Sequence, residues 1–154
     1  MLLTDLLAPE RVRLPLVSTS KDALLRELVA LAVADRGPDV VTAVLRSVQE
    51  RERDLTTGIG GGLAIPHGRS AHVESLVMAA GVCDPPVEYD ALDGAPVTLC
   101  FLLVGPESAA GAHVRALARI SRLLRDDAVR DALLHAPTPA AFLEAVRASE
   151  AATV

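Results

Sequence analysis

Residues 97–104 read Val-Thr-Leu-Cys-Phe-Leu-Leu-Val, and Thr98 is the only clearly polar residue among them. A strand with one face in water alternates apolar and polar residues, so this segment is predicted to be a strand buried on both faces. The small apolar residues 76–82 show the same lack of alternation. Amphipathic helical stretches surround both segments. The sequence therefore predicts an α/β fold in which helices flank the sheet on both faces.

The sheet is expected to be mixed, because the other candidate strands are short or interrupted. Residues 11–17 alternate but contain Pro15, which favours an edge position. Residues 63–66 form a short apolar segment that ends just before His67. A chain of 154 residues suits a single domain. We expect that domain over residues 1–149, with residues 150–154 as a frayed C-terminal tail.

Helices are predicted where apolar residues recur at helical spacing between capping residues. They are expected from the N-cap Ser20 to Gly37-Pro38, from the cap Asp39 to about residue 53, over residues 113–125, from the cap Asp127 to Leu134, and from the N-cap Thr138 to about residue 149. Loops are expected over residues 54–62 and 105–112. Pro85-Pro86 is expected to lie in the connection after the strand at residues 76–82.

Composition excludes several classes of function. A formal net charge of −5 and an aromatic content of 2% argue against a nucleic-acid partner or an anionic membrane surface. No apolar run approaches the roughly 20 residues of a membrane span, and the N-terminus lacks a signal-peptide pattern. Cys83 and Cys100 lie in apolar strand-like runs, so we expect buried thiols rather than a disulfide, and a cytoplasmic protein.

His67 is the most informative of the four histidines. A predicted strand leads to it, Pro66 stiffens the approach, and Gly68 leaves one side of the ring uncovered. Such a ring is suited to act as a nucleophile. The same local sequence is also compatible with a histidine in a turn that has no function. His72 and His135 have no supporting neighbours and are interpreted as surface residues.

The glycines ahead of His67 allow two interpretations. Gly58, Gly60, Gly61 and Gly62 permit positive φ in a tight turn. Alternatively, their successive N–H groups form a nest for an anion. The run lacks the lysine of a P-loop and the spacing of a dinucleotide-binding loop, so neither nucleotide site is indicated.

Three further residues have both a functional and a structural interpretation. Arg51 and Arg53 are cations at the expected end of a helix, where they complement the helix dipole. Either guanidinium also suits binding of a phosphoryl group. His113 shares a helix face with Leu117 and Ile120, so it faces inward at the N-terminal end of its helix and is expected to be neutral. An ordinary core histidine is the alternative.

Two rival chemistries lack their motifs. A zinc site built from His67, His72 and a cysteine matches no usual ligand spacing, so no metal is expected. A serine or cysteine hydrolase needs a nucleophile elbow, and Ser70 near His67 does not make one.

The string Thr57-Gly-Ile-Gly-Gly-Gly-Leu-Ala-Ile-Pro-His67-Gly68 resembles the phosphorylation-site signature of the fructose/mannitol-type (type 2) EIIA domain of the bacterial phosphoenolpyruvate-dependent sugar phosphotransferase system (PTS). The resemblance extends over nearly the whole chain. It includes Leu-Leu-Thr-Asp-Leu-Leu near the start, Arg51-Glu52, Leu92-Asp-Gly94, Phe101-Leu-Leu-Val104, and His113 opening a helix rich in Leu and Ala.

The resemblance implies a phosphohistidine carrier that needs no cofactor. A phosphorylated HPr-like carrier protein would donate its phosphoryl group to His67, which would pass it to a IIB domain during sugar uptake. Arg51 would stabilise charge on the phosphoryl group, and His113 would support the transfer without carrying the group. Thr57 and the glycines at positions 58 and 60–62 would form a phosphate-binding loop.

A regulatory module is the alternative that the resemblance leaves open. Domains of this type in a nitrogen-related PTS branch act as signals, and the phosphorylation state of His67 would then control binding to other proteins. The departures Thr56, Tyr89 and Pro85-Pro86 bear on the identity of the downstream partner.

Overall fold

The computed structural model describes residues 1–152. Within that range the strands form one six-stranded mixed sheet in the order β1-β5-β6-β3-β2, with β4 pairing separately with β6. The strands are β1 (Val12–Leu16), β2 (Gly58–Gly60), β3 (Leu63–Ala64), β4 (His67–Arg69), β5 (Val77–Val87) and β6 (Val97–Gly105). β1 runs parallel to β5, β5 and β6 are antiparallel, and β3 and β4 run parallel to β6. The predicted mixed sheet, with the strand around Pro15 at its edge, is confirmed.

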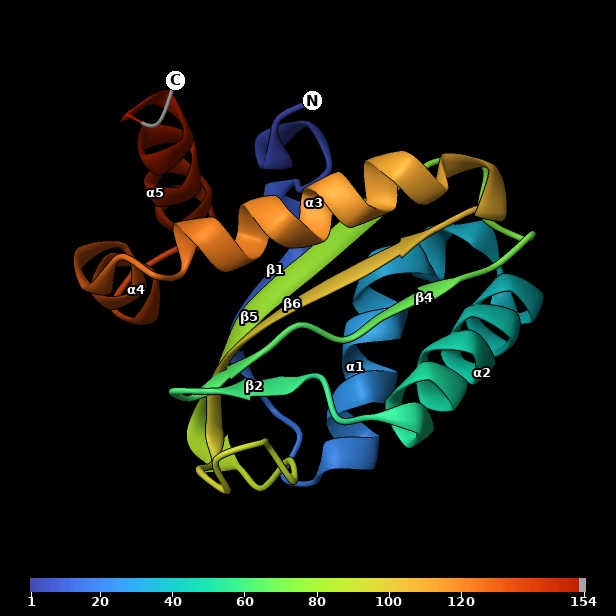
Figure 1. The fold of residues 1–154 in the computed structure, drawn as a ribbon, viewed down its shortest axis with the longest axis horizontal. Helices are drawn as coiled ribbons and strands as arrows, with labels where there is room; N and C mark the ends of the chain where they lie inside the picture. The colour runs from blue at the N-terminus through green and yellow to red at the C-terminus, as the bar shows by residue number, and fades with distance from the viewer. Residues whose placement is uncertain (153–154) are drawn as a thin grey trace.

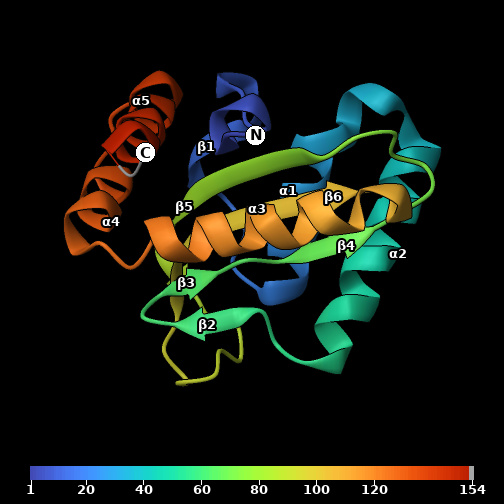
Figure 2. The same cartoon turned by 45° about the horizontal axis from the view of Figure 1, so that its top comes forward.

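Helices cover both faces of this sheet. The α-helices are α1 (Lys21–Val33), α2 (Pro38–Asp54), α3 (Ala110–Leu123), α4 (Asp127–Leu134) and α5 (Pro139–Ala152), with short 3-10 turns at Leu3–Asp5, Pro9–Arg11, Ala34–Arg36 and Glu107–Ala109. α1 and α2 lie together on one face (Figure 1), and α3 crosses the opposite face (Figure 2). No helix within residues 1–152 is both long enough and apolar enough to cross a membrane.

The central strand β6 explains why this part of the sequence has no polar face. Cys100, Leu102 and Val104 pack into the apolar cluster that includes α1 and α2. Leu99, Phe101 and Leu103 pack into the second cluster, which includes α3, α4 and α5. Because successive strand residues point to opposite faces, burial on both sides requires a continuous apolar run. The prediction of a sheet covered on both faces is confirmed.

Two predicted helix caps are confirmed and two are wrong by one or two residues. The side chains of Ser20 and Thr138 accept hydrogen bonds from backbone N–H groups in the first turns of α1 and α5. Asp39 is not a cap, because α2 begins at Pro38, whose fixed φ suits a first helical residue. For α4 the cap is Asp126 rather than Asp127, since the Asp126 carboxylate accepts from two backbone N–H groups.

Three predicted connections contain regular structure. The expected loop at residues 54–62 includes β2, and α3 starts at residue 110 within the expected loop at 105–112. Pro85-Pro86 does not end its strand, because β5 continues to Val87, which pairs with Val97. The register shifts between Val82 and Val87, and such an irregularity accommodates prolines that cannot donate to the ladder.

The C-terminal helix extends beyond the boundary expected at residue 149. α5 continues to Ala152, and Glu150 is buried, where it accepts hydrogen bonds from the N–H groups of Leu3 and Thr4. These bonds satisfy donors at the N-terminal turn and anchor the end of α5, so a frayed tail starting at residue 150 is not what the structure shows. The remaining part of that tail, residues 153–154, lies outside the described residues.

Candidate functional site

His67 is the first residue of β4 and pairs with Leu103 of β6. Its Nδ1 lies 2.9 Å from the carbonyl oxygen of Ile65. A carbonyl can only accept, so Nδ1 carries the proton and Nε2 keeps its lone pair. Within residues 1–152, Nε2 has no hydrogen-bond partner. The local backbone therefore fixes the imidazole in a form whose free nitrogen is a nucleophile.

His113 lies in the first turn of α3 and contacts His67 edge to face, with 5.6 Å between the ring centroids and 62° between the ring planes. Its side chain is buried, with 2% of its surface exposed. Neither ring nitrogen has a hydrogen-bond partner among the residues that the structure describes. The predicted inward orientation is confirmed, and the ring has a donor and an acceptor to offer to a group bound beside it.

Both imidazoles are held neutral. Burial, reinforced by the nearby His67 and Arg69, lowers the pKa of His113 to about 4. For His67, burial is the largest influence and lowers the pKa; the bond to Ile65 opposes this effect, and Arg51 reinforces it. Neutral His67 is the nucleophilic form, so the site favours reaction at neutral pH.

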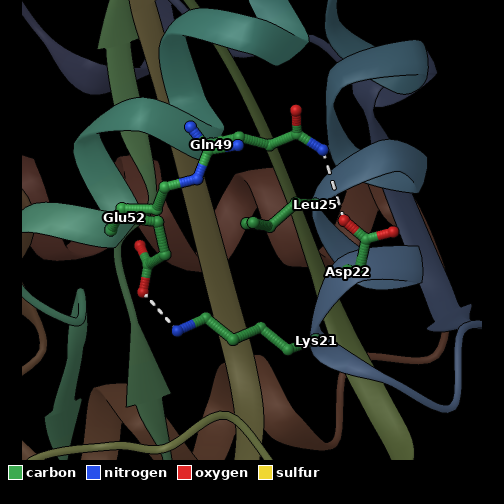
Figure 3. Close-up of a pocket in the computed structure, with 6 residues that line it drawn as sticks. Lys21, Asp22, Leu25, Gln49 and Glu52 are labelled. Carbon is green, nitrogen blue, oxygen red and sulfur yellow. Dashed lines mark hydrogen bonds and ion pairs between the residues drawn. The ribbon is translucent and has the colours of Figure 1, made fainter.

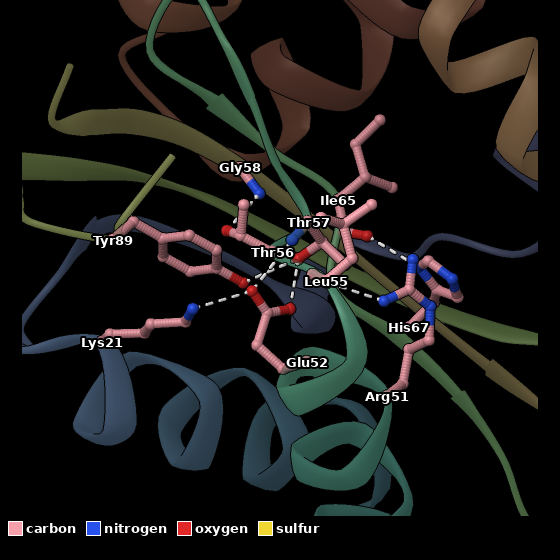
Figure 4. Close-up of polar contacts among 10 residues, drawn as sticks. All are labelled: Lys21, Arg51, Glu52, Leu55, Thr56, Thr57, Gly58, Ile65, His67 and Tyr89. Carbon is pink, nitrogen blue, oxygen red and sulfur yellow. Dashed lines mark hydrogen bonds and ion pairs between the residues drawn. The ribbon is translucent and has the colours of Figure 1, made fainter. Parts of the chain in front are cut away.

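The two rings open into a surface pocket of about 550 Å³. Arg51, in the last turn of α2, lines this pocket, and its guanidinium lies beside His67 (Figure 4). One guanidinium nitrogen, Nη1, donates to the carbonyl of Leu55 at 2.7 Å. The other N–H groups of the guanidinium have no hydrogen-bond acceptor within residues 1–152. Arg53 lines a different pocket. The sequence allowed either arginine to bind a phosphoryl group, and the structure places only Arg51 of these two beside His67.

A second cation, Arg69, also lines the His67 pocket and forms an ion pair with Glu107 at 3.4 Å. Sequence reasoning missed it. Side chains two residues apart on a strand share a face, so recognising β4 as a strand would have placed Arg69 beside His67. Gly68, between them, has a packing role toward α2. A Cβ there would lie 3.0 Å from the backbone nitrogen of Val48, so the glycine allows α2 to pack against β4.

The glycine run does not line the His67 pocket. β3 and β4 run parallel to β6, where Leu63 pairs with Leu99 and His67 pairs with Leu103. Four residues along a strand span about 13 Å, so the turn at residues 60–62 lies well away from the imidazole. The N–H of Gly61 instead donates to the Asp93 carboxylate at 2.9 Å. Positive φ angles at residues 60–62 make the glycines the turn of the β2–β3 hairpin.

Other polar residues do not join the site. His72 and His135 are exposed, as predicted. Cys83 and Cys100 are buried free thiols, also as predicted, with their Sγ atoms 3.9 Å apart. Over residues 1–152 there is no cluster of His, Cys, Asp and Glu side chains that could hold a metal ion.

Most of the chain matches one known protein family. Residues 5–149 match the family model described as "Phosphoenolpyruvate-dependent sugar phosphotransferase system, EIIA 2". The chain belongs to the type 2 EIIA family of the PTS. This match covers nearly the whole chain and includes all three side chains, Arg51, His67 and His113, that the structure brings into one pocket.

Relatives of this EIIA domain include nitrogen regulatory proteins and a sugar-specific PTS component. It is 43% identical to a nitrogen regulatory protein of Bradyrhizobium diazoefficiens, with 82% of each chain covered, and 35% identical to one of Pseudomonas aeruginosa, with 94% of each covered. It is also 32% identical to the fructose-specific EIIABC component of Bacillus subtilis, covering 95% of this chain and 23% of that larger protein.

Solved structures show the same EIIA fold. Nitrogen regulatory protein IIA-Ntr from Neisseria meningitidis aligns with a TM-score of 0.86 at 29% identity, covering 94% of this chain and 98% of that one. The IIA mannitol protein from Escherichia coli aligns with a TM-score of 0.74 at 19% identity, covering 91% and 98%, which shows the fold alone.

Proposed function

We propose that this EIIA domain is a phosphohistidine carrier that accepts its phosphoryl group on Nε2 of His67. The observation that carries the proposal is the hydrogen bond from Nδ1 of His67 to the Ile65 carbonyl, which leaves Nε2 as the nucleophile. A phosphorylated HPr-like carrier protein would be the donor. Its phosphorus–nitrogen bond breaks as the bond to Nε2 forms, and the leaving imidazole takes the electron pair.

The surrounding groups suit this step. Attack through Nε2 places positive charge on the His67 ring, and the Ile65 carbonyl stabilises the Nδ1–H that carries it. Arg51 would bind the equatorial oxygens of the phosphoryl group with the N–H groups not used by Leu55. His113 would donate a hydrogen bond, since its ring nitrogens have no partner within residues 1–152. No metal or nucleotide takes part in this scheme.

The test is incubation with phosphoenolpyruvate, enzyme I and an HPr-like carrier, followed by peptide mapping. One acid-labile, base-stable phosphoryl group on His67 is expected, as for a phosphoramidate. Potassium phosphoramidate, a small chemical donor, tests the nucleophile without the carrier protein. Phosphorylation that persists in a His67→Ala variant with either donor would exclude His67 as the acceptor.

For the next step we propose transfer from His67 to a IIB domain during sugar uptake. Support comes from the fructose-specific relative and from a complex of IIA mannitol with phosphorylated IIB mannitol, whose IIA chain shares the fold at 17% identity. Adding IIB domains to the phosphorylated protein and following the loss of its phosphoryl group tests this step. A phosphoryl group that stays on the protein in the presence of every IIB domain of the host would contradict it.

Regulation is the second candidate, and the identities of the relatives support it. The two nitrogen regulatory proteins are 43% and 35% identical to this chain, whereas the Bacillus fructose component is 32% identical. In this case the phosphorylation state of His67 would control binding to another protein. Affinity capture with phosphorylated protein and with a His67→Ala variant would then recover different partners. We place these exchanges in the cytoplasm, because Cys83 and Cys100 are free thiols.

A further inference from the structure

The carbonyl that holds the His67 ring is itself held by a short hydrogen-bonded path. The N–H of Ile65 donates to the carbonyl of Thr57 at 3.0 Å, and the carbonyl of Ile65 accepts from Nδ1 of His67 at 2.9 Å. Thr57 immediately precedes β2, so this pairing joins the end of the α2–β2 connection to the residues leading into β4. The position of the Ile65 carbonyl therefore depends on the position of Thr57.

Thr57 is clamped by the carboxylate of Glu52 in the last turn of α2 (Figure 4). The Thr57 N–H donates to Oε1 of Glu52 at 2.9 Å, and its hydroxyl donates to Oε2 at 2.5 Å. Because the hydroxyl proton points to Glu52, the Tyr89 hydroxyl donates in turn to Thr57 Oγ1, at 2.9 Å. All three side chains are buried, with exposures of 8% for Glu52, 4% for Thr57 and 0% for Tyr89.

The same carboxylate has a separate contact with α1. Nζ of Lys21, at the start of α1, lies 2.9 Å from Oε1 of Glu52, and this ion pair borders a small neighbouring pocket (Figure 3). Burial opposes ionisation of Glu52, but the hydrogen bonds from Thr57 and Lys21 outweigh it and hold its pKa below the usual value. Glu52 is therefore an anion with two separable roles, one toward α1 and one toward the backbone that leads to His67.

We propose that Glu52 is a positioning residue for phosphoryl transfer, which holds the His67 ring in its Nδ1–H tautomer through Thr57 and Ile65. Glu52 does not touch the reacting atoms. It fixes the acceptor carbonyl, the carbonyl fixes the ring, and the ring presents Nε2. The proposal rests on the proposed function, because it assumes that Nε2 of His67 is the nucleophile.

The test compares variants that separate the two roles of Glu52. In Glu52→Gln an amide NH2 replaces one oxygen, so the side chain can no longer accept from both the N–H and the hydroxyl of Thr57. Thr57→Val removes only the hydroxyl, and Thr57→Ser restores it. Lys21→Met is the matched control, because it breaks the ion pair to α1 and leaves both Thr57 bonds in place.

Nitrogen-15 NMR of the unmodified protein at about pH 8 reads the tautomer of His67 without any transfer reaction. We expect one N–H-type and one unprotonated ring nitrogen in the wild type, in Thr57→Ser and in Lys21→Met, although Lys21→Met should be less stable. We expect averaged shifts, which indicate two tautomers, in Glu52→Gln and Thr57→Val. Phosphoryl uptake from phosphoramidate should fall roughly tenfold or more in the same two variants, since small displacements of a nucleophile have large effects on rate.

The proposal is overturned if Glu52→Gln and Thr57→Val keep the wild-type ring shifts and uptake rate while losing stability, because Glu52 would then only hold the fold together. If Glu52→Gln does not fold, Thr57→Val decides. Failure of the proposed function has a different signature: the wild type would show the Nδ1–H tautomer and take up no phosphoryl group.

Discussion

The imidazole rings of His67 and His113 meet edge to face, with their centroids 5.6 Å apart, and both are neutral in the unmodified protein. A phosphoryl group on Nε2 of His67 would bring two negative charges into the contact region. His113 can respond to this change by taking up a proton, because both its ring nitrogens are without partners within residues 1–152.

Phosphorylation of His67 is expected to raise the pKa of His113, because an adjacent dianion favours the imidazolium form. Nitrogen-15 NMR titration of the unmodified and phosphorylated protein measures the change, and identical His113 titrations in the two states would contradict the contact. His113→Ala should slow both acceptance and donation while His67 remains modifiable. A folded His113→Ala protein that cannot be labelled at all would assign the carrier role to His113 instead.

Burial of His113 is expected to make the protein less stable as the pH falls. Its pKa is about 4 when folded, against 6.5 for an unperturbed histidine, so the unfolded chain binds the proton first. The contribution of neutral His113 to the free energy of unfolding is fully present above pH 6.5. It is lost as the pH falls towards 4, by up to about 1.4 kcal/mol per pH unit. Urea unfolding between pH 6.5 and 5, above most carboxylate titrations, measures this slope. His113→Phe should flatten it, and an unchanged slope would show that His113 does not contribute.

Arg51→Lys is expected to slow phosphoryl transfer by roughly 10²-fold, because a point charge replaces a planar set of donors. Arg53→Lys is the matched control, since Arg53 lies two residues further along and lines another pocket. Both variants should have a free energy of unfolding within about 1 kcal/mol of the wild type, because Arg51 is only partly buried, Arg53 is exposed, and such cations contribute little to stability. Rapid-quench measurements with the carrier protein give the rates. Equal rates for the two variants would leave Arg51 as a helix-end charge only.

Gly68→Ala is expected to destabilise the protein by about 1–3 kcal/mol and to slow transfer, because the new methyl group presses against the backbone of α2 and overpacks the contact. The Cβ would lie 3.0 Å from the Val48 nitrogen and 3.2 Å from the Ser47 carbonyl carbon. Gly111→Ala, in the first turn of α3, adds the same group with only the Arg115 guanidinium nearby and should not destabilise. Thermal unfolding compares the stability of the two variants. Equal stability would show that α2 moves away from the added methyl group at no cost.

The fold could be predicted because its main signals are local. The apolar run of β6 and the caps Ser20 and Thr138 each lie within a few residues of the structure they specify. β2 and β4 were missed because three-residue strands containing glycine carry no alternation that a pattern can detect. Missing β4 also hid Arg69, whose place beside His67 follows only from a strand spacing of two residues.

The contents of the site were predictable only in part. The sequence predicts three residues of the pocket, His67, Arg51 and His113. It also predicts the glycine run beside His67, because the two are close in sequence, although they are not close in space. The parallel pairing of β3 and β4 with β6 separates them, and that pairing depends on residues about 35 positions away. The ion pair of Glu52 with Lys21 and the hydrogen bond of Thr57 with Tyr89 likewise join distant segments, so Glu52 alone looks like an ordinary acid on a helix.

The ring nitrogens of His113, which have no hydrogen-bond partner within residues 1–152, also bear on the equilibrium between the unmodified and the phosphorylated protein. A buried donor without an acceptor raises the free energy of the unmodified state by about 1–3 kcal/mol. A phosphoryl oxygen that accepts from His113 removes that penalty, which shifts the equilibrium with a donor protein towards this chain by roughly 5- to 150-fold. In the proposed phosphoryl relay, a larger fraction of this domain would then carry a phosphoryl group at any given ratio of phosphorylated to free donor protein.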